Sequence, residues 1–407
     1  MRAYERFLQY VRIHTTSSET SGTHPSFAGE RVLAEKLAEE LSELALTDVL
    51  VDEKCYVYGF LPATEGLSEL PGLGLLSHMD TSEEASGENV KPVIWENYDG
   101  ESLTLPGNSL VLSTDRFPEM RLLRGETLIT TDGTTLLGAD DKAGIAEILT
   151  ALEIVQKEKI PHGPLYICFT PDEEIGEGAD YVDYSHFHPA FAYTVDGGDV
   201  NCLEYENFNA ASAKVRIRGL SVHPGDAKDR MINAQNVAME FHSLLPEAER
   251  PEHTEGCEGF FHLTEMSGRV SEAELSYIVR DHDRERFEQR KKMLEDAAAE
   301  LNRRYGEGTV TLTVKDSYYN MLEKIRPHMH LIRTAEQAIS ENGMVPAAVP
   351  IRGGTDGARL SYEGIPCPNL GTGGFHFHGV FECITEERMD RAANVLVSII
   401  RRYGEPV

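Results

Sequence analysis

Three short apolar runs, each followed by acidic residues or histidine, constrain the fold of this chain more than any other feature of its sequence. GLGLLS leads into His78, and FAYTV leads into Asp196. LYICF leads, across three residues, into Glu173 and Glu174. Runs of this length are typical of buried strands in a mainly parallel sheet. Because sites in open α/β sheets form outside the carboxyl ends of the strands, we expect these polar ends to converge.

Helical segments alternate with these strands. Residues 28–46 and 143–157 carry apolar side chains at three- and four-residue steps, which predicts amphipathic helices. Residues 48–60, rich in valine and tyrosine, are strand-like. The alternation predicts an α/β domain in which helices flank a mixed, mainly parallel sheet.

The pattern changes near residue 208. SAKVRIRGL and TVTLTVKDSY alternate apolar and polar residues, as strands with one exposed face do, and residues 234–245 and 284–304 are predicted helices. We therefore predict that residues 208–317 form an inserted α+β domain with an antiparallel sheet. Residues 1–207 and 318–407 are then the first and second parts of the other domain.

Composition narrows the classes of function. Of 407 residues, 68 are acidic and 38 are basic, so the formal net charge is −30. Nucleic acids and anionic membrane surfaces both require basic faces, so we expect neither as a partner. The six cysteines form no CxxC pair, the N-terminus has no apolar signal core, and no run approaches the roughly 18 apolar residues of a membrane span. These features predict a soluble cytoplasmic protein.

The polar residues at the strand ends have the chemistry of a metal site. Imidazole and carboxylate ligands suit zinc or a similar first-row ion, and carboxylates can bridge two ions. Two ions about 3.5–4 Å apart can polarise a carbonyl group and lower the pKa of a bridging water to about 7. The alternative for each of these short motifs is a solvated surface loop without a metal ion. The set comprises His78, Asp80, Asp140, Asp141, Glu173, Glu174, Asp196 and a late histidine, His376 or His378.

The spacing of residues within these motifs supports a metal site. His78 and Asp80 are two residues apart and lie on one side of an extended segment, so Asp80 can hold the second ring nitrogen of His78. Glu173 and Glu174 are adjacent, so one can bind metal while the other acts as general base. The buried strand before this pair and the turn IGEGA after it disfavour a solvated acidic loop.

Other motifs are weaker. His186 and His188 share the spacing of His376 and His378 but lack acids from a strand end, so we expect a surface loop there. GTTLLGAD resembles a phosphate-binding loop but has Ala139 where lysine is required, which excludes nucleotide binding.

Taken together, several motifs resemble the co-catalytic zinc exopeptidases related to carboxypeptidase G and aminoacylase, over nearly the whole chain. They are LLSHMDT, TDGTTLLGADDKAG, TPDEEIGEGA, TVDGG, VHPGDAKDRMINA and GGFHFHG. TEGCEGFFHL and IVRDHDR favour the tripeptide aminopeptidase branch of that family. The resemblance implies the zinc exopeptidase fold, release of the N-terminal residue from tripeptides, and an inserted domain that serves as a lid and as the surface of a homodimer. The alternative is a dipeptidase or an N-acyl-amino-acid amidohydrolase on the same scaffold.

The resemblance also implies two zinc ions per subunit and assigns their ligands. His78 and Asp196 bind one ion, Glu174 and His378 bind the other, and Asp140 bridges them. The family pattern has the ligand histidine directly before a glycine, which favours His378 and leaves His376 as an additional histidine.

Three further roles follow from the resemblance. Asp80 orients the first histidine ligand, and Glu173 is the general base and proton shuttle. His223, in the VHPG motif, matches the lid histidine that stabilises the oxyanion and that comes from the partner subunit in several relatives.

Two arginines are candidates for binding the free carboxylate of a short peptide. Arg280 and Arg352 have the fork of N–H donors that suits a carboxylate. The alternative for Arg280 is an ion pair with Asp281 or Asp283. The glycine-rich stretch after Arg352 fits a binding loop because glycine lets the backbone approach a ligand closely.

Overall fold

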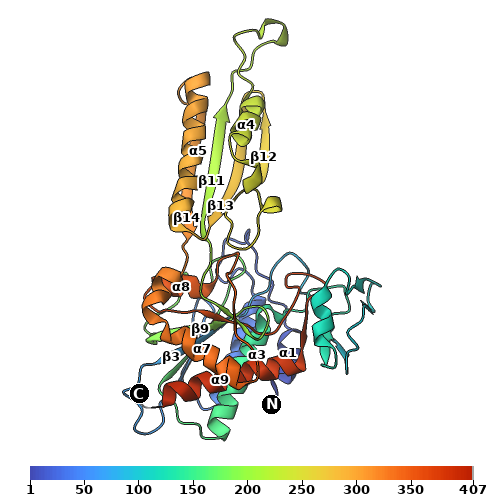
Figure 1. Cartoon of the computed structure of the whole chain (residues 1–407), viewed down its shortest axis with the longest axis vertical. Helices are drawn as coiled ribbons and strands as arrows, with labels where there is room; N and C mark the ends of the chain where they lie inside the picture. Colours follow the sequence, from blue (N-terminus) through green and yellow to red (C-terminus); the bar gives the residue numbers. More distant parts are fainter. Residues whose placement is uncertain (406–407) are drawn as a thin grey trace. The chain divides into compact units, whose positions relative to one another are not determined.

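The computed structural model describes residues 1–405, and Figure 1 shows them coloured along the sequence. Contacts divide these residues into two compact units. The first unit contains Met1–Tyr205, Glu323–Val349 and the described residues from Thr355 onward. The second unit contains Glu206–Leu322 and Pro350–Gly354.

The first unit is built on an eight-stranded sheet in the order β1-β2-β8-β3-β9-β16-β10-β15. The four central strands, β8, β3, β9 and β16, are parallel to one another. β2 is antiparallel to both of its neighbours, β1 and β8. β10 is antiparallel to β16 and parallel to β15. This confirms the predicted mixed, mainly parallel sheet. The strands are β1 (Thr47–Val51), β2 (Val57–Leu61), β3 (Leu73–His78), β8 (Leu165–Thr170), β9 (Phe191–Val195), β10 (Cys202–Glu204), β15 (Ala347–Ala348) and β16 (Asn369–Leu370).

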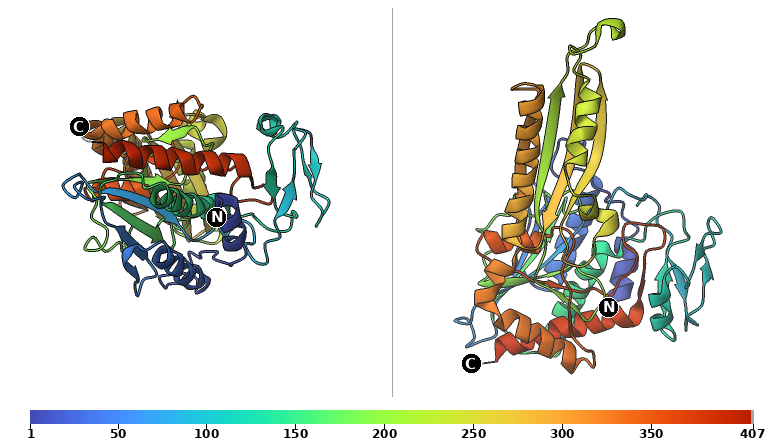
Figure 2. Two further views of the ribbon diagram at one scale, coloured as in Figure 1. Left: turned by 90° about the horizontal axis from the view of Figure 1, so that it is seen from below. Right: turned by 45° about the horizontal axis from the view of Figure 1, so that its top comes forward.

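Helices flank both faces of this sheet. Most of α3 is buried, since it packs between β3 on one side and α1 and α9 on the other. Figure 2 (left) shows α3 and α9 on one face of the sheet and α2 on the opposite face. The helices are α1 (Ala3–Tyr10), α2 (Gly29–Glu43), α3 (Ala139–Lys157), α6 (Leu322–Ile325, at the boundary between the units), α7 (His330–Glu341), α8 (Asp356–Tyr362) and α9 (Glu386–Gly404).

Two small antiparallel sheets complete the first unit. One has the order β17-β7-β4 and the other pairs β5 with β6. Their apolar side chains share one cluster, to which Tyr98, Met120 and Leu128 belong. The elements are β4 (Val93–Trp95), β5 (Leu103–Thr104), β6 (Val111–Leu112), the 3-10 helix η1 (Pro118–Leu123), β7 (Leu128–Thr130) and β17 (Cys383–Thr385).

The second unit has an antiparallel sheet in the order β12-β13-β11-β14. Burial alternates along β11 and β13, as the sequence pattern predicts, because α4 and α5 cover one face of this sheet. The expected separate antiparallel sheet is therefore confirmed. Its elements are β11 (Asn209–Arg218), α4 (Ala234–Ser243), β12 (Phe260–Arg269), β13 (Glu272–Asp281), α5 (Arg284–Tyr305) and β14 (Val310–Tyr318).

Short 3-10 helices lie in the connections: η2 (Pro224–Asp226), η3 (Glu247–Glu249), η4 (Pro251–His253) and η5 (Arg326–His328). Across residues 1–405, no helix combines the length and the apolar character that crossing a bilayer requires.

Candidate metal centre

The carboxyl ends of β3, β8 and β9 bring the predicted strand-end residues to one edge of the large sheet. His78 is the last residue of β3, and Asp196 directly follows β9. Glu173 and Glu174 lie in the turn after β8. Nε2 of His78 is 3.9 Å from Oδ1 of Asp196. The three polar strand ends thus meet in a single cluster.

Asp140 lies between two imidazoles in this cluster. Its Oδ1 is 2.9 Å from Nε2 of His78, and its Oδ2 is 3.2 Å from Nε2 of His378. Nε2 of His378 is also 3.0 Å from Oε2 of Glu174. The five residues predicted as metal ligands therefore form one continuous line of contacts, in the order Asp196, His78, Asp140, His378 and Glu174.

The turn that starts α3 places Asp140 at this edge. Gly138 precedes the helix with a φ of 81°, in the left-handed region that glycine adopts readily. Asp140 and Asp141 belong to the first turn of α3, but their backbone dihedral angles are not helical. Asp140 therefore extends from the start of the helix to the strand ends, where it meets both imidazoles.

Asp80 lies behind the cluster and contacts two of its parts. Nδ1 of His78 is 3.1 Å from the backbone oxygen of Asp80 and 3.3 Å from its Oδ1. The backbone N–H groups of Glu173 and Glu174 donate to the Asp80 carboxylate at 2.9 and 3.1 Å. Asp80 is fully buried, so this one carboxylate fixes both the ring of His78 and the turn that carries the two glutamates.

Glu173 differs from its neighbours in the cluster. It is half-buried, and its carboxylate has no hydrogen bond from the side chains or backbone of residues 1–405 that the structure describes. Burial raises the pKa of Glu173 well above its usual value. The backbone of Glu173 is fixed by Asp80, while its carboxylate forms no such bond with the described residues. A carboxylate in this situation is suited to accept a proton from a bound water.

Acidic groups outnumber histidines in the cluster, and several of its groups have pKa values outside their usual range. Hydrogen bonding to Asp140 raises the pKa of His378 to about 11. Burial raises the pKa of Glu174 to about 7 and that of Asp196 to about 6. Excess buried carboxylates favour an added positive charge. The cluster therefore has the electrostatic character of a cation site.

The donor atoms fit a metal ion. Ligand atoms of His78, Asp140 and Glu174 all lie within 4.8 Å of one another. Oε1 of Glu174 is buried, and no partner for it is present among residues 1–405, which leaves it available for coordination. Imidazole nitrogens combined with carboxylate oxygens suit Zn²⁺ or a similar first-row ion.

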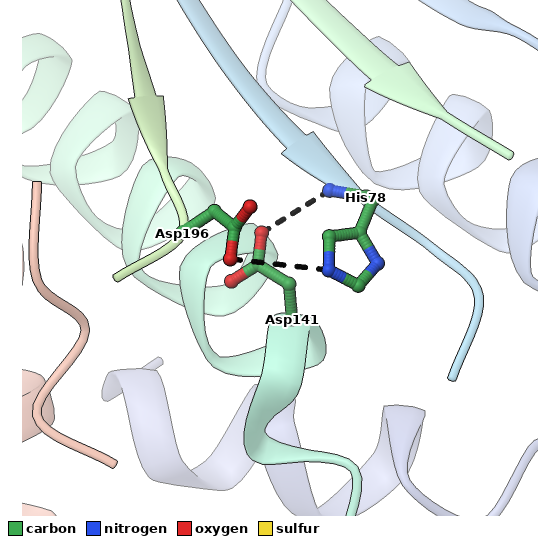
Figure 3. Close-up of side chains that lie close together, drawn as sticks. All are labelled: His78, Asp141 and Asp196. Atoms are coloured by element: carbon green, nitrogen blue, oxygen red, sulfur yellow. Dashed lines mark hydrogen bonds and ion pairs between the residues drawn. The ribbon is translucent and has the colours of Figure 1, made fainter. Parts of the chain in front are cut away.

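Asp141 also belongs to the cluster, although the family resemblance assigned no role to it. Its carboxylate, His78 and Asp196 form a second group whose ligand atoms lie within 4.8 Å of one another. Figure 3 shows Asp141 and Asp196 facing His78 from two different elements. Oδ2 of Asp141 accepts the backbone N–H of His78 at 3.1 Å and the hydroxyl of Ser77. The paired aspartates in the sequence are the signal for this position, but they do not say which of the two faces the metal.

The other histidines have different surroundings. Nδ1 of His376 is 3.5 Å from Oε1 of Glu119, and its ring centroid is 4.1 Å from that of Phe117. His376 thus contacts the η1 region, while His378 contacts the carboxylate cluster. Nε2 of His188 is 3.1 Å from the Tyr166 hydroxyl.

The remaining predicted site residues all lie in the second unit. His223 is exposed and precedes η2, where its Nδ1 accepts the backbone N–H of Gly225 at 3.1 Å. Arg280 lies near the end of β13, and Nη1 of Arg280 donates to the backbone oxygen of Arg352 at 2.7 Å. Both guanidinium groups lie over the ring of Phe260, at 6.0 and 5.8 Å from its centroid.

The two arginines have no acidic partner within the described part of the chain. Asp281 forms an ion pair with Arg290 at 2.8 Å instead of with Arg280. Asp283 accepts the N–H of Arg286 and caps α5. Arg352 donates to the backbone oxygen of Gly256. The pairing of Arg280 with a neighbouring aspartate, which the sequence left open, is therefore not observed.

Comparison with known proteins places this geometry among peptidases. Residues 132–402 match the peptidase family M20/M25/M40. The chain is 54% identical over 402 residues to the peptidase T of Clostridium novyi, and the match covers 98% of each chain.

Solved structures agree with the fold. A tripeptidase from Staphylococcus aureus matches with a TM-score of 0.78 at 25% identity, over 99% of this chain and 98% of that chain. A dinuclear metal-binding peptidase of family M20 from Bacillus subtilis matches with a TM-score of 0.65 at 15% identity, over 98% of each chain. The expected zinc exopeptidase fold is thus confirmed.

Proposed function

Because the chain belongs to the peptidase family M20/M25/M40, we propose that it is a two-zinc aminopeptidase which releases the N-terminal residue of tripeptides. The observation that carries this proposal is Asp140, held 2.9 Å from Nε2 of His78 and 3.2 Å from Nε2 of His378. The naming of the full-length relative as peptidase T and of the solved likeness as a tripeptidase supports the substrate class. A dipeptidase or an N-acyl-amino-acid amidohydrolase is not favoured by these relatives.

The five residues in the line of contacts would hold the ions. His78 and Asp196 would bind one, Glu174 and His378 would bind the other, and Asp140 would serve both. When bound, such ions polarise the scissile carbonyl and lower the pKa of a bound water to about 7.

Glu173 is proposed to move the proton. Its backbone is fixed because its N–H donates to Asp80 at 2.9 Å, and its half-buried carboxylate is free of hydrogen bonds from the described residues. The carboxylate accepts a proton from water as the water attacks the carbonyl carbon. It then delivers that proton to the amine that leaves.

His223 is proposed to stabilise the oxyanion that forms during attack. Its ring is exposed on the second unit, and a donor of this kind is worth a few kcal/mol in the transition state. Its Nδ1 accepts the Gly225 N–H at 3.1 Å, so in this arrangement Nε2 carries the proton and is the atom able to donate.

Arg280 and Arg352 are proposed to bind the peptide's free carboxylate. The chain has a net charge of −30 and therefore many acidic side chains. Neither guanidinium forms an ion pair with an acidic side chain within residues 1–405, and the neighbouring Asp281 is paired with Arg290. Two adjacent cations without a counter-ion favour an anion, and a carboxylate matches the guanidinium fork.

Replacing Arg280 with alanine is expected to raise KM for a tripeptide by roughly 10- to 100-fold, because a charge-assisted hydrogen bond is lost. KM for the same tripeptide ending in an amide should change little. Steady-state kinetics with both substrates measures the difference. Arg216→Ala is the matched control, since Arg216 lies on the same sheet and is paired with Glu274 at 2.8 Å. Equal losses with the acid and the amide would contradict the assignment.

The proposed function is tested by supplying one tripeptide in its free form and in its N-acetylated form, both in zinc-containing buffer. We expect release of the N-terminal residue from the free peptide alone. Cleavage of only the acetylated peptide would move the chain to the amidohydrolase alternative. Cleavage of a dipeptide in preference to the tripeptide would support the dipeptidase.

Two further assignments complete the proposal. The second unit is proposed to act as a lid and as the surface of a homodimer, which is compatible with β12 being an edge strand whose last residues are exposed. A cytoplasmic location is supported by the six cysteines, since all are free and four are buried.

A further inference from the structure

Glu382 is a buried acid that neither the motifs nor the proposed mechanism uses. Glu382 is only 1% exposed to solvent. It ends the loop that carries His378, and that loop is closed by two backbone hydrogen bonds between Phe375 and Cys383, at 2.8 and 3.0 Å. Cys383 begins β17, which pairs with β7. Glu382 therefore has a fixed position at the base of a loop that bears a metal ligand.

The carboxylate of Glu382 accepts three backbone N–H groups from a distant segment. Leu137 and Gly138 donate to Oε2 at 2.7 and 2.8 Å, and Asp140 donates to Oε1 at 3.0 Å. These three residues surround the start of α3. One side chain thus joins the loop of His378 to the turn that carries Asp140.

These contacts explain why an acid stands at this position. The first N–H groups of a helix have no partner within the helix, and Gly138 supplies no side chain to cap them. A negative charge is favoured near a helix start, and a carboxylate can accept from several donors at once. A glutamine would offer one oxygen and would direct its own N–H groups at other donors.

We propose that Glu382 is a positioning residue of the metal centre, which holds Asp140 at the distance from the His378 loop that both need to bind the same ion. This inference rests on the metal centre of the proposed function. Oδ2 of Asp140 already lies 3.2 Å from Nε2 of His378 without a metal ion. Glu382 belongs to the loop of His378, and its side chain accepts the backbone N–H of Asp140.

The test measures zinc binding by metal-free protein in competition with a chromophoric chelator. Glu382→Gln is expected to weaken zinc binding by about 10- to 100-fold, as the loss of an outer partner of a metal ligand does. The matched control is Glu387→Gln. Glu387 also accepts a backbone N–H, from Thr127 at 2.8 Å, but Thr127 precedes β7 and does not belong to the turn that carries Asp140. Its zinc affinity should equal that of the unsubstituted chain.

Thermal unfolding of the metal-free proteins separates positioning from stability. If Glu382→Gln lowers Tm but binds zinc as tightly as the unsubstituted chain, Glu382 is only a helix cap and the proposal is wrong. If that variant does not fold, Glu382→Asp replaces it, because aspartate keeps the charge but withdraws the carboxylate by one methylene. Unchanged zinc affinity in a folded Glu382→Asp would also overturn the proposal.

The readout distinguishes this inference from the proposed function. Zinc affinity is measured without a peptide, so an unsubstituted chain that binds zinc but does not cleave tripeptides contradicts the function and leaves the inference standing. An unsubstituted chain that binds no zinc contradicts the metal centre and the role of Glu382 together.

Discussion

A Glu173→Gln variant is expected to keep both zinc ions and to lose turnover, with kcat lower by about 100- to 10,000-fold. Glutamine has the size of glutamate but cannot take a proton from water. The backbone of the turn should not move, because Asp80 accepts the N–H groups of Glu173 and Glu174 at 2.9 and 3.1 Å whatever the side chain is. KM should change little, since substrate contacts are retained.

The measurement is steady-state cleavage of a free tripeptide together with the zinc content of the dialysed protein. Glu177→Gln is the matched control, because Glu177 lies in the same turn with its side chain 46% exposed. We expect its kcat to equal that of the unsubstituted chain. A Glu173→Gln variant with full turnover would remove the general base from this position, and one that lost zinc would make Glu173 a ligand.

The core of the first unit could be predicted from sequence because its strands are uniformly apolar. Every residue of β3 and β9 is buried, so their runs in the sequence stand out, and their parallel pairing brings His78 and Asp196 to the same edge. The sequence pattern predicts the stretch 48–60 less accurately, as one strand-like segment. The structure divides it into β1 and β2, because Asp52 accepts the N–H groups of Lys54 and Tyr56 at 2.9 Å each and turns the chain.

The choice between neighbouring residues of the same type could not be made from residue chemistry. His376 and His378 both have a positive φ, of 58° and 63°. Their contacts differ because the ring of His376 packs against Phe117 and lies beside Glu119. These two residues lie about 260 positions earlier in the chain, so the sequence around the histidines does not reveal the contact. The family resemblance, not the chemistry, selected His378.

Partners that are backbone groups leave no pattern in a sequence. Glu382 accepts N–H groups from Leu137, Gly138 and Asp140, and any residue except proline has such a donor. Arg280 shows the converse case. Nearby acids made a local ion pair the alternative for Arg280, but Asp281 is bound by Arg290, one turn or more along α5. Spacing along the chain cannot decide between such competing partners.

The second large effect is expected for Asp140→Asn, which should weaken zinc binding by more than about 100-fold, beyond the loss typical of an outer partner, and abolish turnover. Asp140 is the only one of the five proposed ligands that contacts both imidazoles, at 2.9 and 3.2 Å. An asparagine is neutral and offers one oxygen, so it cannot serve two ions as a carboxylate does. Both ions should therefore be lost, whereas a change at Asp196 should affect mainly one.

Asp141→Asn is the control that makes this result specific, because it changes the adjacent acid in the same turn of α3. Oδ2 of Asp141 accepts the N–H of His78 at 3.1 Å and the hydroxyl of Ser77, and an amide oxygen can accept both. Its zinc affinity should fall by less than about 10-fold, which is the low end for an outer partner. Zinc titration of both metal-free variants gives the comparison. A larger loss in Asp141→Asn than in Asp140→Asn would transfer the bridging role to Asp141, whose carboxylate, with His78 and Asp196, forms the second group of ligand atoms within 4.8 Å.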